Sequence, residues 1–215
     1  MEDGRRLHSS GTDLEIRLLL LKAHTRTFRR SSTTAGLIQC TLESFDIEKC
    51  PPYVAVSYTW GPPDVCETVM VNGSPLRVRE NLHAVLSILR SRLSTGFSED
   101  PIRENKLMGD YFWVDAVCIN QKDVHERGHQ VNLMAQIFST ASCAVAWLGP
   151  ESRNSALAIN AIRTGNPRKV HQIQVDHRVY VNQYSRDRHE IQSALVSLLA
   201  RPYWRRVWVI QEFAL

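Results

Sequence analysis

The chain has 215 residues, of which 43% are hydrophobic and 22% charged, a composition that excludes a disordered, collagenous or coiled-coil protein. Its net charge of +4 is too small an excess to require a nucleic-acid partner. No stretch is apolar over the roughly 18 residues that a membrane span needs, and no signal-peptide core follows Met1. The five cysteines form no C-x-x-C pair, which disfavours a disulfide framework or a zinc ribbon. We therefore expect a cytoplasmic protein that does not associate with membranes.

The N-terminal half reads as strands, with a flexible N-terminus at residues 1–14. An apolar run predicts a buried strand over Glu15–Leu21, followed by an exposed loop at 24–35. Residues 53–60 alternate between large apolar and small or polar side chains, which is typical of a strand. The dipeptide Asn72-Gly73 between two short apolar runs predicts a hairpin with a type I′ turn, although Ser74-Pro75 could lengthen its loop.

The next part of the chain indicates an α/β arrangement. Asn81 is the expected N-cap of an amphipathic helix. The run 111–119 is almost continuously apolar, which predicts a strand buried on both faces that carries one carboxylate, Asp115. An amphipathic helix around 131–138 and a buried strand at 144–148 follow, and this order implies a parallel crossover. We therefore predict one domain over 15–215 with a mostly parallel central sheet flanked by helices, as in flavodoxin-like folds.

The C-terminal part is less regular. Residues 151–187 are expected to be an irregular, basic insertion that begins with a short helix at 155–163. A helical pattern returns at 190–200, and Pro202 ends it. The densely apolar residues 204–215 stop abruptly, and we expect the natural protein to continue beyond them.

One metal motif has to be weighed. His125-Glu126-Arg127-Gly128-His129 is a literal H-E-x-x-H, which on a helix would place two imidazoles one turn apart for zinc, with the glutamate as general base. Against this interpretation, Gly128 weakens the helix and no third ligand follows at the spacing of known zinc proteases. The expected role of the segment is a solvated helix start, without a metal.

Polar residues gather where the predicted strands end. Because the carboxyl ends of parallel strands meet at one edge of a sheet, these side chains predict a ligand site there. The alternative is structural: Asp115 and Glu212 could be charges held in ion pairs, for instance with Arg205 or Arg206. The residues that carry the hypothesis are Ser57, Tyr58, Thr59, Trp60, Asp115, Cys118, Asn120, Gln121, Gln211 and Glu212.

Together these segments closely resemble the fungal heterokaryon incompatibility (HET) domain from about Ile16 to the end of the chain. The departures are small, such as Val56 where leucine is usual and Tyr203-Trp204 where Trp-Phe is common. In the family pattern Glu126 belongs to an acidic-basic pair, whereas the two histidines do not belong to it. The segments that carry the resemblance are residues 53–61, Asn81-Leu82, residues 113–121 with Asp123, Glu126, Arg127, Gln130, Val131 and Met134, then Trp147-Leu148-Gly149, and residues 201–212.

The resemblance implies a module of proteins that trigger cell death when genetically different fungal cells fuse. HET domains are in turn distantly similar to Toll/interleukin-receptor (TIR) domains. Through that similarity Glu212 takes the position of the glutamate that cleaves nicotinamide from NAD. One carboxylate could suffice for this chemistry, because nicotinamide in NAD is already a cationic leaving group. NAD is then a possible substrate, and no other cofactor is implied.

Three functions remain open. The first is a docking or self-assembling death-signalling module, for which Glu212 would be inert. The second is a NAD-cleaving hydrolase in which Glu212 and Asp115 face one cleft, Trp60 or Trp208 stacks on a ring, and Arg205 and Arg206 hold the pyrophosphate. The third, a nucleic-acid binder or nuclease that uses the arginine-rich segments, is disfavoured by the weak net charge.

Overall fold

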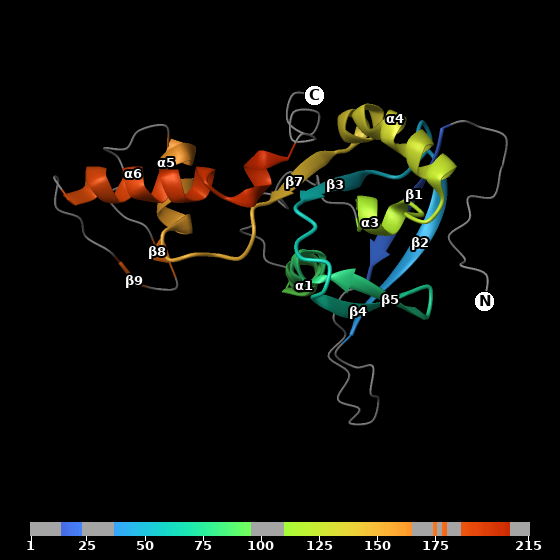
Figure 1. Cartoon of the computed structure of the whole chain (residues 1–215), viewed down its shortest axis with the longest axis horizontal. Helices are drawn as coiled ribbons and strands as arrows, with labels where there is room; N and C mark the ends of the chain where they lie inside the picture. The colour runs from blue at the N-terminus through green and yellow to red at the C-terminus, as the bar shows by residue number, and fades with distance from the viewer. Residues whose placement is uncertain are drawn as a thin grey trace, which may run out of the picture. The chain divides into compact units, whose positions relative to one another are not determined.

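The structure is a computed structural model that describes residues 14–22, 37–95, 110–164, 174–175, 178–179 and 186–206. Several predictions fall outside these residues: the loop at 24–35, nearly all of the N-terminal stretch 1–14 that was expected to be flexible, and most of the insertion that was expected to be polar and basic. The described chain forms two compact units, one extending to Trp147 and the other from Leu148 to Arg206 (Figure 1).

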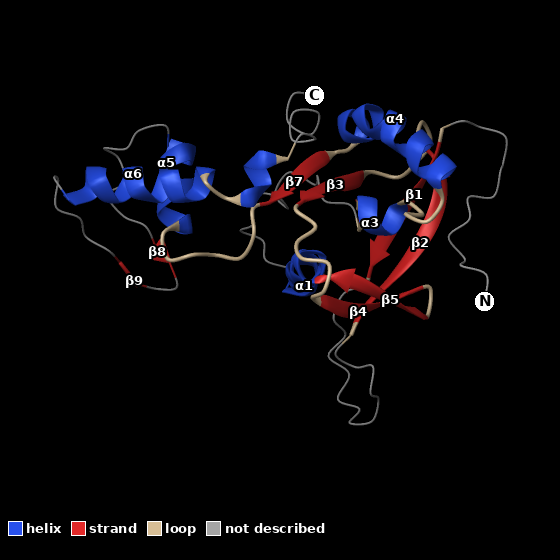
Figure 2. Cartoon of the chain, in the orientation of Figure 1, coloured by secondary structure: helices blue, strands red, loops and turns tan. Residues whose placement is uncertain are grey.

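The first unit is built on a seven-stranded sheet with the order β5-β4-β2-β1-β6-β3-β7 (Figure 2). The strands are β1 (Glu15–Leu21), β2 (Ile38–Asp46), β3 (Tyr53–Tyr58), β4 (Cys66–Val71), β5 (Ser74–Arg79), β6 (Tyr111–Trp113) and β7 (Cys143–Trp147). The helices of this unit are α1 (Glu80–Thr95), α3 (Asp115–Cys118) and α4 (Val124–Thr140).

The sheet is mixed, so the prediction of a mostly parallel sheet was wrong. The strand pairs β2 with β4, β3 with β6 and β3 with β7 are parallel, whereas β1 with β2, β1 with β6 and β4 with β5 are antiparallel. The sequence did not indicate β2, whose exposed and half-buried positions lack a continuous apolar run. Strand β1 lies between β2 and β6 and is antiparallel to both. The sheet therefore contains strands that run in opposite directions. The α/β class itself is confirmed.

The hairpin β4–β5 agrees with its sequence signature. Asn72 has φ 50° and Gly73 has φ 77°, as a type I′ turn requires at both central positions. Val71 pairs directly with Ser74, so Ser74-Pro75 does not lengthen the loop.

The run 111–119 is not one strand. Only Tyr111–Trp113 pair in the sheet, and the chain then turns into the short helix α3, in which the amides of Val117 and Cys118 donate to the Val114 carbonyl. Val117 and Cys118 are buried, so the apolar run continues although the secondary structure changes. A short apolar run cannot by itself distinguish a buried strand from a buried helix. Asp115 consequently begins a helix rather than interrupting a strand.

The two longer helices lie where the apolar pattern predicts them, with one corrected terminus. α1 begins at Glu80, so Asn81 lies inside the helix and is not its N-cap. Helix α1 contacts β4 and β5 (Figure 1). Helix α4 buries Gln130, Met134, Ile137 and Phe138.

Strand β7 is less buried than expected. It pairs with β3 at the end of the strand order, and its residues are half-buried or exposed. β6 and β7 are both parallel to β3, so the parallel crossover through α4 is confirmed.

The second unit contains α5 (Ser155–Thr164), the strand pair β8 (Gln174–Val175) and β9 (Arg178–Val179), α6 (Arg186–Leu199) and the 3-10 turn η1 (Pro202–Arg205). Ala158 of α5 packs with Ala194 and Leu198 of α6.

Arg201 connects the beginning and the end of the second unit by hydrogen bonds. Its guanidinium donates to the Leu148 carbonyl at 3.0 Å and to the Ser155 hydroxyl at 2.7 Å. The neighbouring Gly149 has φ 101°, a conformation that favours glycine. No helix among the described residues is long and apolar enough to cross a membrane.

Candidate functional site

Trp60 and Asp115 meet where β3 and β6 end. The indole Nε1 of Trp60 donates to Oδ2 of Asp115 at 2.8 Å, and the amide of Ala116 donates to Oδ1 at 2.7 Å. β3 and β6 are parallel neighbours, so the residues that follow them emerge at the same edge of the sheet. The structure therefore brings together two of the predicted site residues, and both carboxylate oxygens of Asp115 accept hydrogen bonds from the protein.

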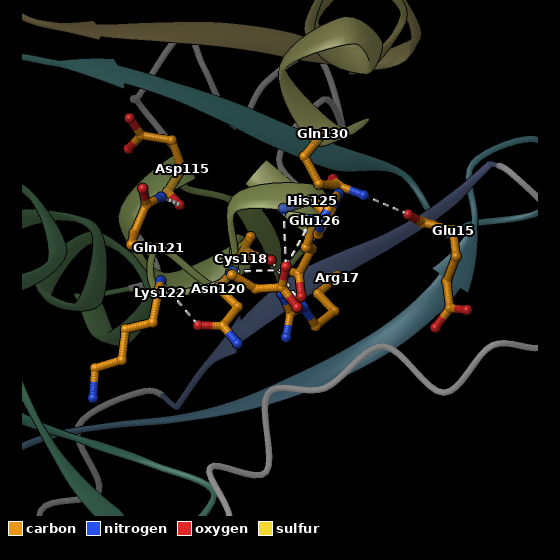
Figure 3. Close-up of polar contacts among 11 residues, drawn as sticks. Glu15, Arg17, Asp115, Cys118, Asn120, Gln121, Lys122, His125, Glu126 and Gln130 are labelled. Atoms are coloured by element: carbon orange, nitrogen blue, oxygen red, sulfur yellow. Dashed lines mark hydrogen bonds and ion pairs between the residues drawn. The ribbon is translucent and has the colours of Figure 1, made fainter. Parts of the chain in front are cut away.

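Gln121 joins the same group from the loop after α3. Its side-chain Nε2 donates to the main-chain carbonyl of Asp115 at 2.9 Å, and Figure 3 shows the two residues next to each other. This bond spans α3 and fixes its first residue relative to the loop that follows it. We call Trp60, Arg79, Asn81, Asp115 and Gln121 the strand-end cluster.

Arg79 and Asn81 support Trp60 from the hairpin and from α1. The Arg79 guanidinium carbon lies 5.1 Å from the centre of the Trp60 ring, and Nη1 of Arg79 donates to the Gly61 carbonyl at 2.8 Å. The Asn81 amide donates to the Thr59 carbonyl at 2.9 Å. Gly61 has φ 77°, and a Cβ there would lie 3.1 Å from the Asn81 Nδ2 atom. This turn therefore requires glycine, both for its backbone angle and for the space that Asn81 occupies.

A buried ion pair joins β1 and α4. The guanidinium Nη2 of Arg17 in β1 contacts Oε1 of Glu126 in α4, and the two side chains are 4% and 7% exposed. Arg17 also donates from Nε to the Cys118 carbonyl at 2.8 Å, and Glu126 Oε1 accepts the Asn120 amide at 2.6 Å. Figure 3 shows Glu126 and Arg17 directed toward each other beside Cys118 and Asn120. The pair connects the centre of the sheet, α3 and α4.

The start of α4 explains the H-E-x-x-H segment. Asp123 is the N-cap, and its Oδ1 accepts the amides of His125 and Glu126 at 3.0 and 3.1 Å. Glu126 is turned inward to Arg17 and is therefore not placed to act as a general base for a metal-bound water. Across the described ranges, no three His, Cys, Asp or Glu side chains come together as a metal site.

The buried thiols of the first unit are poor nucleophiles. Burial raises the pKa of Cys118 to about 12 and that of Cys40 also to about 12. Cys118 Sγ accepts the Val114 amide at 3.3 Å. Both thiols are protonated at neutral pH, which is the unreactive form.

The remaining predicted site residues lie in different environments. Ser57 and Tyr58 are interior residues of β3, each 2% exposed, and Asn120 is 9% exposed. Arg205 and Arg206 belong to the second unit, where Arg206 lies 5.5 Å from the Tyr203 ring centre. Trp208, Gln211 and Glu212 lie outside the described residues, so the proposed site roles of this group stay predictions.

Two residues of the described site, Arg17 and Arg79, were not predicted from the sequence. Arg17 is the only charged residue between Glu15 and Leu21, and a charge in so apolar a strand signals a buried partner. Nothing in the sequence identified that partner as Glu126, because the two residues are 109 positions apart. Arg79 carried no signal, since alternating charges on an edge strand are common.

Comparison with known proteins gives two matches. The sequence model of the family described as heterokaryon incompatibility protein (HET) matches residues 53–212. The Neurospora crassa protein named heterokaryon incompatibility protein 6, OR allele, is 26% identical over 209 residues, covering 83% of this chain. The match spans only 29% of the length of that protein. No solved structure matches the chain.

Proposed function

The chain belongs to the heterokaryon incompatibility (HET) family, and on that premise we propose that it is a docking module in fungal non-self recognition, acting in incompatibility-triggered cell death. The chain corresponds to less than a third of the Neurospora relative. In the proposed role, the chain engages protein partners or further copies of itself.

Exposed apolar side chains in the second unit carry this proposal. Ile159 and Ile162 of α5 are 47% and 59% exposed, and Val196 and Leu199 of α6 are 61% and 59% exposed. The α5–α6 core beneath them consists mainly of alanine and leucine. Apolar side chains that gather on one surface are typical of a site that contacts another protein, and we propose that these four side chains form such a surface.

Asp115 and Glu126, two carboxylates of the first unit, have structural partners. The carboxylate of Asp115 holds the Trp60 indole and an α3 amide, and Glu126 is buried against Arg17. Carboxylates that are engaged in this way stabilise the fold, whereas a catalytic carboxylate must face its substrate.

We also propose that the similarity to TIR domains suggested by the sequence extends to three strands, β6, β3 and β7. These strands are parallel to one another. A NAD-cleaving activity would rest on Glu212. It is the competing hypothesis, and the variant Glu212→Ala separates it from docking.

Expression of the protein in a filamentous fungus, with cell viability as the readout, tests the proposal. We expect Ile162→Lys with Val196→Lys to abolish killing at unchanged protein level, because two charges would block an apolar contact. Gln192→Lys, at another exposed position of α6, is the matched control and should still kill. Killing by the double variant at the level of the unmodified protein would contradict the proposal.

A further inference from the structure

Helix α4 presents two histidines that the proposed function does not use. His125 and His129 are four positions apart in a continuous helix from Val124 to Thr140, so their side chains emerge one turn apart on the same flank. His125 is exposed and His129 is half-buried. The intervening Gly128 does not interrupt the helix, and the space around its Cα is open, with nothing within 4 Å of an added Cβ.

The two histidines lie on a different face of α4 from the residues that are directed into the protein. Glu126 and Gln130, each one position after a histidine, are directed into the protein, where Glu126 contacts Arg17 and Gln130 Nε2 donates to the Glu15 carbonyl at 2.8 Å (Figure 3). A rotation of about 100° per residue places both imidazoles beside this buried face rather than on it. Neither imidazole is bonded to another described residue.

Two neutral imidazoles one helical turn apart are suitable ligands for zinc, copper or nickel. In a tetrahedral zinc complex they would occupy two positions and leave two for water or for ligands from a second molecule. With Glu126 held by Arg17, such a site would lack the general base of a zinc protease.

We propose that His125 and His129 bind a divalent transition-metal ion, such as Zn²⁺, as an open two-nitrogen site on the surface of α4. The site is independent of the apolar residues of α5 and α6. Because the helical spacing of the two imidazoles exists only in the folded protein, bound metal should also stabilise the fold.

The experiment is a calorimetric titration of the full chain with ZnCl₂, together with thermal unfolding with and without zinc. We expect zinc to bind and to raise the unfolding midpoint, and a chelator to reverse the rise. His125→Ala and His129→Gln should each weaken binding by about tenfold or more, which corresponds to about 1.4 kcal/mol or more. Circular dichroism of each variant checks that it is folded.

A matched control changes the spacing and keeps the number of histidines. Arg127→His combined with His129→Gln places the two imidazoles two positions apart, where they point to different sides of the helix. This variant should bind zinc as weakly as His129→Gln alone. Equal zinc binding by the unmodified chain and His125→Ala, or full binding by the spacing variant, would overturn the proposal.

Discussion

Arg17 in β1 and Glu126 in α4, 109 positions apart, form a buried ion pair in the first unit. Each residue also binds main chain, Arg17 at the Cys118 carbonyl and Glu126 at the Asn120 amide. The pair therefore joins β1, α3 and α4 through hydrogen bonds that are protected from water.

Removing one member of this pair should be strongly destabilising. Arg17→Met leaves the Glu126 carboxylate buried without its cation, and we expect the free energy of unfolding to fall by about 3–5 kcal/mol. Chemical denaturation measures the change. The double variant Arg17→Met with Glu126→Leu removes both charges and should recover much of that loss. A single variant as stable as the unmodified protein would show that the pair does not contribute to the fold.

Trp60 and Asp115 should be energetically coupled. Asp115→Ala leaves the indole Nε1 without its acceptor, and Trp60→Phe removes the donor, so each change should cost about 1–3 kcal/mol. Because the two residues share the bond, the double variant should cost less than the sum of the single variants, by about 0.5–3 kcal/mol. Strict additivity in this double-mutant cycle would argue against the bond.

Two glycines should respond in opposite ways to alanine. Gly61→Ala forces a side chain into φ 77° and against Asn81, and should destabilise by about 1–2 kcal/mol or more. Gly128 lies inside α4 with open space around it, so Gly128→Ala should stabilise by up to about 1 kcal/mol. Thermal unfolding of the two variants side by side tests this difference, and a shift of the same sign in both would contradict it.

The buried cysteines predict a pH dependence of stability. Burial raises the pKa of Cys118 from 9.0 to about 12, so between these values the unfolded chain loses a proton that the folded chain keeps. Stability should therefore fall as pH rises above about 9. Urea unfolding at pH 8 and pH 10 measures the loss. Cys118→Ala should show a smaller loss than the unmodified protein, and an identical loss would refute the assignment.

Local patterns in the sequence predicted the elements whose signals are short-range. Asn72-Gly73 fixed the hairpin turn, the apolar run at Glu15–Leu21 gave β1, and helical spacing gave α4. The relative directions of the strands were not predictable, because they depend on how β2 pairs with β1. That pairing joins residues far apart in the chain, such as Glu15 and Asp46.

The candidate site was predicted in part. Trp60, Asp115 and Gln121 were expected near one another from the ends of neighbouring strands, and they are joined by hydrogen bonds. The change from strand to helix at Asp115 was missed, since buried strands and buried helices give the same short apolar run. Arg17 was missed because ion-pair partners at such a separation are brought together only by the tertiary fold.

We propose that the chain acts in cell death by docking and not by cleaving NAD. The most direct measurement is the NAD content and viability of fungal cells that express the protein with Glu212→Ala, compared with the unmodified protein. We expect that Glu212→Ala kills as efficiently as the unmodified protein and leaves the NAD content the same as with that protein. The opposite result is that the unmodified protein depletes NAD, whereas the folded Glu212→Ala variant preserves NAD and does not kill. That result would contradict docking without NAD cleavage.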